Sequence, residues 1–93
     1  MVIGIVRIGL HLFDCQSLKE KRSIMKSLTQ RLRNKFNAAI AEIDHQDLWQ
    51  TSTIGAAVIG DSTGHANSQL QSIVTFIERQ PMVLITNIET ETL

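Results

Sequence analysis

The chain has 93 residues, of which 43% are hydrophobic and 19% charged, so it fits one globular domain and not a disordered segment. Nine basic and nine acidic residues give a formal net charge of zero. The single cysteine, Cys15, excludes an internal disulfide and fits a reducing compartment.

No apolar run approaches the roughly 20 residues that a bilayer-spanning helix needs. The opening MVIGIVRIGLHLF lacks a basic leading region, is interrupted by Arg7 and is followed by no small-residue cleavage site, so it does not fit a signal peptide. We therefore expect one domain over residues 1–93, located in the cytoplasm and without a membrane partner.

The first predicted element is a β-strand from Val2 to Phe13, rich in β-branched residues. Its even positions are almost all apolar and are expected to face the helices. The odd positions form a mixed face that contains Ile3, Ile5, Arg7 and His11.

A long helix is predicted from Ser17 to Phe36, and Asn37 can end it. Ser17 and Glu20 have the spacing of a capping box. Apolar residues recur at intervals of three, four and seven and fill an arc of roughly 120°, the width of a core-facing stripe. These residues are Leu18, Ile24, Met25, Leu28, Leu32 and Phe36.

Basic residues are concentrated in this helix, which holds seven basic residues and one acid and so has a net charge of +6, against −6 for the other residues. Four of them fall within about 60° of one another on one flank of the apolar stripe, over roughly 21 Å of helix axis. We call these four the basic flank: Lys19, Arg22, Lys26 and Arg33. Arg31 and Lys35 lie on the opposite flank. Lys21 falls within the apolar arc and is expected to extend its amine to solvent.

A second strand is predicted from Ala38 to Asp44, although AAIAEI also tolerates a helix, and DHQDLWQ follows as a turn or irregular link. The segment Thr53 to Gly60 is the third predicted strand. After a turn at 61–64, a second helix runs to about Arg79 and stops before Pro81. Its core face is predicted to contain Ala66, Leu70, Ile73, Val74 and Ile77.

The last predicted strand covers Met82 to Ile88 and leads into a polar ETETL tail. The order β-α-β-β-α-β predicts an α+β, ferredoxin-like sandwich. Its four-stranded antiparallel sheet has the strand order 4-1-3-2, with both helices on one face. The other face exposes Ile3 and Ile5 in a monomer, so we expect a homodimer or higher oligomer in which a second sheet covers them.

Three stretches together, VIGIVRIGLHLF, SLKEKRSIMKSLTQRLRNKFN and AEIDHQDLWQ, resemble the YlxP family of small bacterial proteins of unknown function. SLKEKR and DHQDLWQ are the most specific motifs, and the resemblance covers most of the chain. It implies a ferredoxin-like fold. The family's genes often lie beside those for translation initiation and small-subunit ribosome-binding factors, which implies a role near ribosome assembly or RNA. It implies no active site.

The basic flank is a candidate RNA-binding surface, because cations at helical spacing can follow phosphates. The alternative is a solvated helix face without a ligand. The chain has no tyrosine and only 4% aromatic residues, so a base-stacking sheet is not expected. Contact with the phosphates of structured RNA is therefore the favoured hypothesis.

The DHQDLWQ motif is a candidate interaction patch made of Asp44, His45, Gln46, Asp47 and Trp49. The simpler interpretation is that its polar residues satisfy turn amides while Trp49 anchors the link. A metal site would need three or four converging ligands, with His65 as a candidate beside this motif, but the histidines are scattered over three elements. We therefore expect no metal and no cofactor.

The letters Gly60-Asp61-Ser62-Thr63-Gly64 match G-x-S-x-G, but 93 residues cannot supply an α/β-hydrolase sheet and its partner residues. A helix cap at Ser62 or Thr63 is the better interpretation. Cys15 has no paired base, and no catalytic residue is assigned. The sequence thus favours a non-enzymatic RNA- or ribosome-associated factor. The alternative is a small-ligand-binding regulatory or protein-interaction module.

Overall fold

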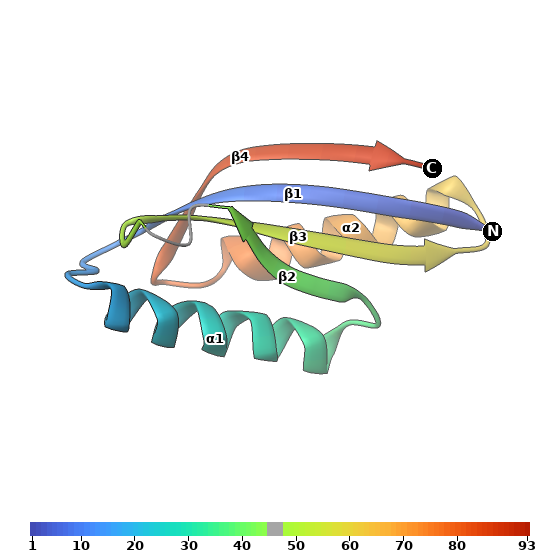
Figure 1. The fold of residues 1–93 in the computed structure, drawn as a ribbon. Coiled ribbons are helices and arrows are strands. Elements are labelled where there is room, and N and C mark those ends of the chain that lie inside the picture. The colour runs from blue at the N-terminus through green and yellow to red at the C-terminus, as the bar shows by residue number, and fades with distance from the viewer. Residues whose placement is uncertain (45–47) are drawn as a thin grey trace.

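The elements follow one another in the order β-α-β-β-α-β in the computed structural model, which describes residues 1–44 and 48–93 (Figure 1). The strands are β1 (Val2–Leu12), β2 (Ala39–Asp44), β3 (Thr51–Gly60) and β4 (Val83–Thr92), and the helices are α1 (Leu18–Lys35) and α2 (Thr63–Glu78). Neighbouring strands are antiparallel and the sheet order is β2-β3-β1-β4. The predicted ferredoxin-like fold and strand order are confirmed.

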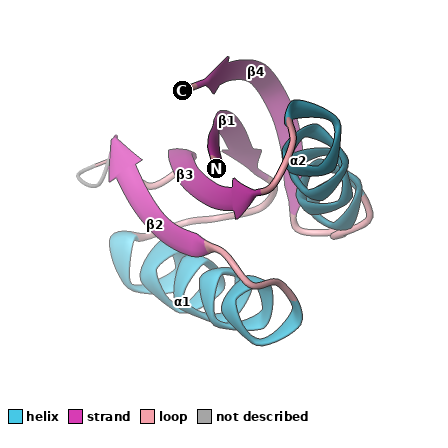
Figure 2. Ribbon diagram, turned by 90° about the vertical axis from the view of Figure 1, so that its right-hand side faces the viewer, coloured by secondary structure: helices cyan, strands magenta, loops and turns pink. Residues whose placement is uncertain are grey.

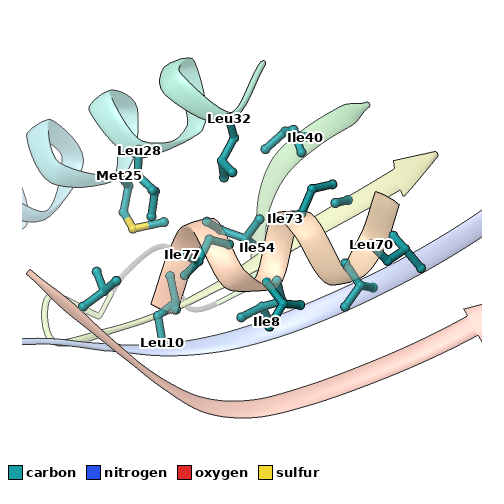
Figure 3. Close-up of a cluster of buried hydrophobic side chains, with 14 of the residues drawn as sticks. Ile8, Leu10, Met25, Leu28, Leu32, Ile40, Ile54, Leu70, Ile73 and Ile77 are labelled. Carbon is teal, nitrogen blue, oxygen red and sulfur yellow. The ribbon is translucent and has the colours of Figure 1, made fainter. Parts of the chain in front are cut away.

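Both helices lie on the same side of the sheet (Figure 2). Helix α1 packs under β2, and α2 packs against β1, β3 and β4. The even side chains of β1 from Val6 to Leu12 are fully buried toward these helices, as the alternating pattern predicts. Side chains from both helices and all four strands form one core. In Figure 3, Ile54, Ile73 and Ile77 lie between the side chains of α1 and those of β1.

The start of α1 is fixed by side-chain capping. The Ser17 hydroxyl accepts a hydrogen bond from the Glu20 N–H at 3.1 Å, as the capping box predicts. The Glu20 carboxylate accepts from the Gln16 N–H at 2.7 Å, one residue before the position that the usual box would use. The helix ends at Lys35, because Phe36 has an extended backbone conformation.

Helix α2 begins after Ser62, whose hydroxyl accepts from the His65 N–H at 3.1 Å. All five residues predicted for its core face are buried. The helix starts very close to the end of β3. A Cβ atom at Gly60 would lie 3.1 Å from the Ala66 nitrogen, so this junction favours glycine.

Strand β4 is longer than predicted. The strand was predicted to end at Ile88, but the polar tail continues it to Thr92, which pairs with Gly4. Leu93 then exchanges two backbone hydrogen bonds with Ile3, at 2.8 and 3.1 Å. These polar residues are compatible with a strand because β4 lies at the edge of the sheet. Thr90 and Thr92 are on the face toward the helices, and Glu89 and Glu91 are on the opposite face.

The chain is elongated, with principal extents of 42 × 21 × 17 Å. Its N- and C-terminal ends lie at the same end of the sheet (Figure 1). Among the described helices, none has the length and apolar character needed to cross a membrane.

Candidate nucleic-acid interface

The basic flank lies on one exposed side of α1. All four of its side chains are exposed to solvent. Arg22, Lys26 and Arg33 line one shallow depression of about 270 Å³ on the side of α1 that faces β2. Lys19 lies one turn before Arg22 and is not part of this depression. The structure therefore places three of the four predicted RNA-binding residues at the same depression.

Arg33 is held in place by the neighbouring strand. Its Nη2 donates a hydrogen bond to the Ile40 carbonyl oxygen at 2.8 Å. That bond connects the last turn of α1 to β2 and satisfies a carbonyl of an edge strand. Arg33 thus has a structural contact as well as a place in the depression, and its substitution would perturb both.

Lys21 is the clearest departure from the sequence analysis. We expected its amine to reach solvent, but the side chain is only 1% exposed and its Nζ lies 3.1 Å from Glu42 Oε2. The same carboxylate oxygen accepts from the Ser52 hydroxyl at 2.6 Å. The expectation was wrong because β2 packs over this face of α1 and supplies a carboxylate, so that the ammonium has an ionic partner inside.

Glu42 also lines the depression on the basic flank. Its side chain is 23% exposed, and its carboxylate already contacts Lys21 and Ser52. Its negative charge is therefore largely compensated by Lys21. The depression then has an excess of positive charge from Arg22, Lys26 and Arg33.

The opposite flank of α1 has a different environment. Arg31 donates to Gln80 Oε1 at 2.6 Å, and its guanidinium carbon lies 5.9 Å from the centre of the Phe76 ring. Lys35 Nζ lies 5.7 Å from the same ring centre. These cations join α1 to the end of α2 through a hydrogen bond and cation–π contacts, so the two flanks can be compared by mutation.

The predicted interaction patch is only partly described. His45, Gln46, Asp47 and the side chain of Asp44 lie outside the described part of the structure. Trp49 is 39% exposed, next to Leu48 at 50%. The link is tied to β1, because the Leu12 N–H donates to the Gln50 carbonyl oxygen at 2.8 Å. Trp49 is therefore an exposed aromatic side chain, and the residue after it is hydrogen-bonded to β1.

Asp44 and His65 lie at opposite ends of β3, because Asp44 pairs with Thr53, whereas His65 follows Gly60. The seven residue steps from Thr53 to Gly60 correspond to about 23 Å of strand. The other candidate ligands, His45, Gln46 and Asp47, lie outside the described residues. In the part of the chain that the structure describes, no group of three His, Cys, Asp or Glu residues could hold a metal ion.

Ser62 and Cys15, the other two residues considered for chemistry, have structural roles. Ser62 is the cap of α2, as predicted. Cys15 is 1% exposed within the hydrophobic core, and its thiol donates to the Ser17 carbonyl oxygen at 3.4 Å.

The predicted interface residues Ile3 and Ile5 are half-buried on the sheet face opposite the helices. The sequence analysis missed more exposed apolar residues near them. Ile59 pairs with Ile3 and is 64% exposed, Leu93 is 64% exposed, and Ile43 is 38% exposed. A signal was present in the sequence, because Ile59 occupies an odd position of β3, on the same face as Gly55 and Ala57.

Residues 3–90 match a family that is described only as proteins of unknown function (DUF503). The chain is also similar to a Bacillus subtilis (strain 168) protein named "Uncharacterized protein YlxP". The two sequences are 37% identical over 90 residues, which cover 97% of this chain and 98% of the relative. The resemblance found in the sequence motifs therefore extends over nearly the whole chain.

Proposed function

The chain belongs to the DUF503 family, and from this premise we propose that it is a cytoplasmic, non-enzymatic RNA- or ribosome-associated factor that binds phosphates through the basic flank. The observation that carries the proposal is the meeting of Arg22, Lys26 and Arg33 at one depression. The gene neighbourhood implied by the family resemblance agrees with this direction.

The arrangement suits a phosphate backbone better than isolated bases. The basic flank lies along a rigid helix that spans roughly 21 Å from Lys19 to Arg33, a length over which several phosphates of one strand can be met. Arginine and lysine contacts of this kind give affinity and register without reading sequence.

The sheet face offers little for base stacking. Its central odd positions in β1 and β3 are aliphatic, small or charged, with Ile5 opposite Ala57 and Arg7 opposite Gly55. Structured RNA recognised by shape and phosphate position is therefore the favoured ligand. Four phosphate contacts predict a slope of log K against log salt concentration near −3.

The first test is charge reversal of the whole basic flank. The variant Lys19→Glu, Arg22→Glu, Lys26→Glu, Arg33→Glu should lose retention on RNA or on ribosomal subunits, because repulsion replaces each phosphate contact. Far-UV circular dichroism checks that the variant is folded. A folded variant with unchanged retention would remove the proposal.

A second candidate function is a small-ligand-binding regulatory or protein-interaction module. It is favoured by a pocket of about 320 Å³ between α1 and the segment that leads into β4, within the size range of small-molecule sites. Ile24, Leu28 and Val83 supply apolar lining, and Arg31 supplies a cation. Native mass spectrometry of protein purified at high salt should show a bound small molecule in this case, and no nucleic acid.

A further inference from the structure

We propose that the sheet face opposite the helices binds a second copy of this chain and forms a two-fold homodimer. This face is the outer side of β2, β3, β1 and β4, and Figure 2 shows it without a covering helix. It presents the most exposed isoleucine of the strands, Ile59 at 64%, together with Leu93 at 64% and Ile43 at 38%. Apolar side chains in this number on one face need a cover.

The apolar residues form a ridge at one end of the face. Ile59 is the cross-strand partner of Ile3, and Leu93 is hydrogen-bonded to Ile3 from the other side. The three side chains therefore stand in one row across β3, β1 and the end of β4.

A hollow of about 450 Å³ lies beside the ridge. Its floor consists of the small residues Ala39, Ala41, Gly55 and Ala57, and its walls include Ile5 and Ile43. Ile43 packs over Gly55, because a Cβ atom at Gly55 would lie 3.1 Å from Ile43 Cδ1. The hollow lies beside this contact.

Ridge and hollow are related in the way that a two-fold dimer requires. Along β3, outward positions follow one another as Gly55, Ala57 and Ile59. A two-fold axis that crosses the strands at Ala57 places Ile59 of each copy near the Gly55 position of the other, against Ile43 and the hollow beside it. The same surface then supplies both the projection and the cavity that receives it, which is the definition of an isologous interface.

The size of the face also fits one copy of the chain. The strands β1, β2, β3 and β4 have 11, 6, 10 and 10 residues. At a spacing of about 4.8 Å between strands they give a footprint of roughly 600 Å². Because side chains project from the sheet, the accessible area of this face is larger than its footprint. It approaches the roughly 800 Å² per partner of a standard stable interface.

Charge disfavours RNA on this face. Its polar part carries Arg7 with Glu89 and Glu91, which are the β4 partners of Arg7 and Ile5. Two carboxylates and one guanidinium repel a phosphate backbone overall. The basic flank lies on the helical side and remains open in such a dimer.

Sedimentation equilibrium tests the proposal with matched variants. At roughly 50 µM, above the Kd expected for a standard-size interface, the wild-type chain should sediment at twice its mass of 10.4 kDa. Ile59→Glu should raise the dimer Kd by about 30-fold or more, the scale of an interface hot spot. Ala41→Glu, which fills the hollow from an exposed position, should do the same.

Met82→Glu is the control, because Met82 is 44% exposed but precedes β4 in a loop away from this face. It should leave the dimer unchanged. Circular dichroism confirms that each variant is folded. A wild-type monomer at this concentration, with or without a small molecule or RNA bound to the face, overturns the proposal, and so does an Ile59→Glu variant that dimerises like wild type.

Discussion

The buried ion pair between Lys21 and Glu42 gives the sharpest test of how α1 is held against the sheet. Replacing Lys21 with Met keeps most of the aliphatic chain and removes the ammonium group. The Glu42 carboxylate then loses the Nζ at 3.1 Å but keeps the Ser52 hydrogen bond, and its side chain is 23% exposed. Replacing Glu42 with Gln instead removes the negative charge from beside the Lys21 side chain, which is 1% exposed.

The two single substitutions should therefore differ in magnitude. Breaking a buried ion pair costs about 3–5 kcal/mol when the remaining charge stays buried. Glu42→Gln should fall in that range, and Lys21→Met should cost about 2 kcal/mol, because water still reaches the carboxylate. The double variant Lys21→Met, Glu42→Gln leaves no buried charge and should be more stable than the Glu42→Gln variant.

Urea denaturation at one fixed protein concentration measures these differences. For a chain of this size, Glu42→Gln should lower the midpoint by about 2 M or more at an m value near 1–1.5 kcal/mol per M. Lys19→Met is the matched control, because Lys19 is exposed on the same helix, and it should stay within about 0.5 kcal/mol of wild type. Equal stabilities of Lys21→Met, Glu42→Gln and wild type would refute the assignment of a structural role to this pair.

Two further predictions concern the start of α2. Gly60→Ala should destabilise the fold by about 1–2 kcal/mol, because the new Cβ lies 3.1 Å from the Ala66 nitrogen, whereas Gly64→Ala should stabilise it by up to about 1 kcal/mol, since nothing lies within 4 Å. Thermal melts of the two variants should shift in opposite directions, and shifts of the same sign would contradict the packing described here. Ser62→Ala should cost about 1 kcal/mol through loss of the cap, with Ser72→Ala in the exposed helix interior as the control. Equal melting temperatures for these two serine variants would show that the cap contributes little.

The fold could be predicted from sequence wherever a pattern within one segment was enough to identify a strand or a helix. The period of two in β1 and the capping signals at Ser17 and Ser62 correspond to local rules, and the structure confirms them. The end of β4 was missed because ETET is polar. Its alternation of Thr and Glu was a strand signal, which becomes decisive only when β1 is present to pair with it.

Lys21 and the sheet face could not be predicted for a different reason. Whether a lysine in an apolar arc reaches water depends on what lies over it, and here that is Glu42, 21 residues later in the chain. In the same way, the hollow beside Gly55 depends on side chains from β2, β3 and β1 together. Such features depend on tertiary contacts that a single segment does not encode.

The role of the basic flank is tested most directly by a pair of variants with the same change in charge. Arg22→Glu, Lys26→Glu reverses two cations at the depression, and Arg31→Glu, Lys35→Glu reverses two on the opposite flank; Arg33 is left intact because it bonds to Ile40. Binding to a structured RNA is measured by fluorescence anisotropy at several salt concentrations. The first variant should weaken binding strongly and reduce the salt slope by about 2, while the second should retain most of the affinity and the slope. Equal losses in both variants, or a slope unchanged in the first, would contradict phosphate binding at the basic flank.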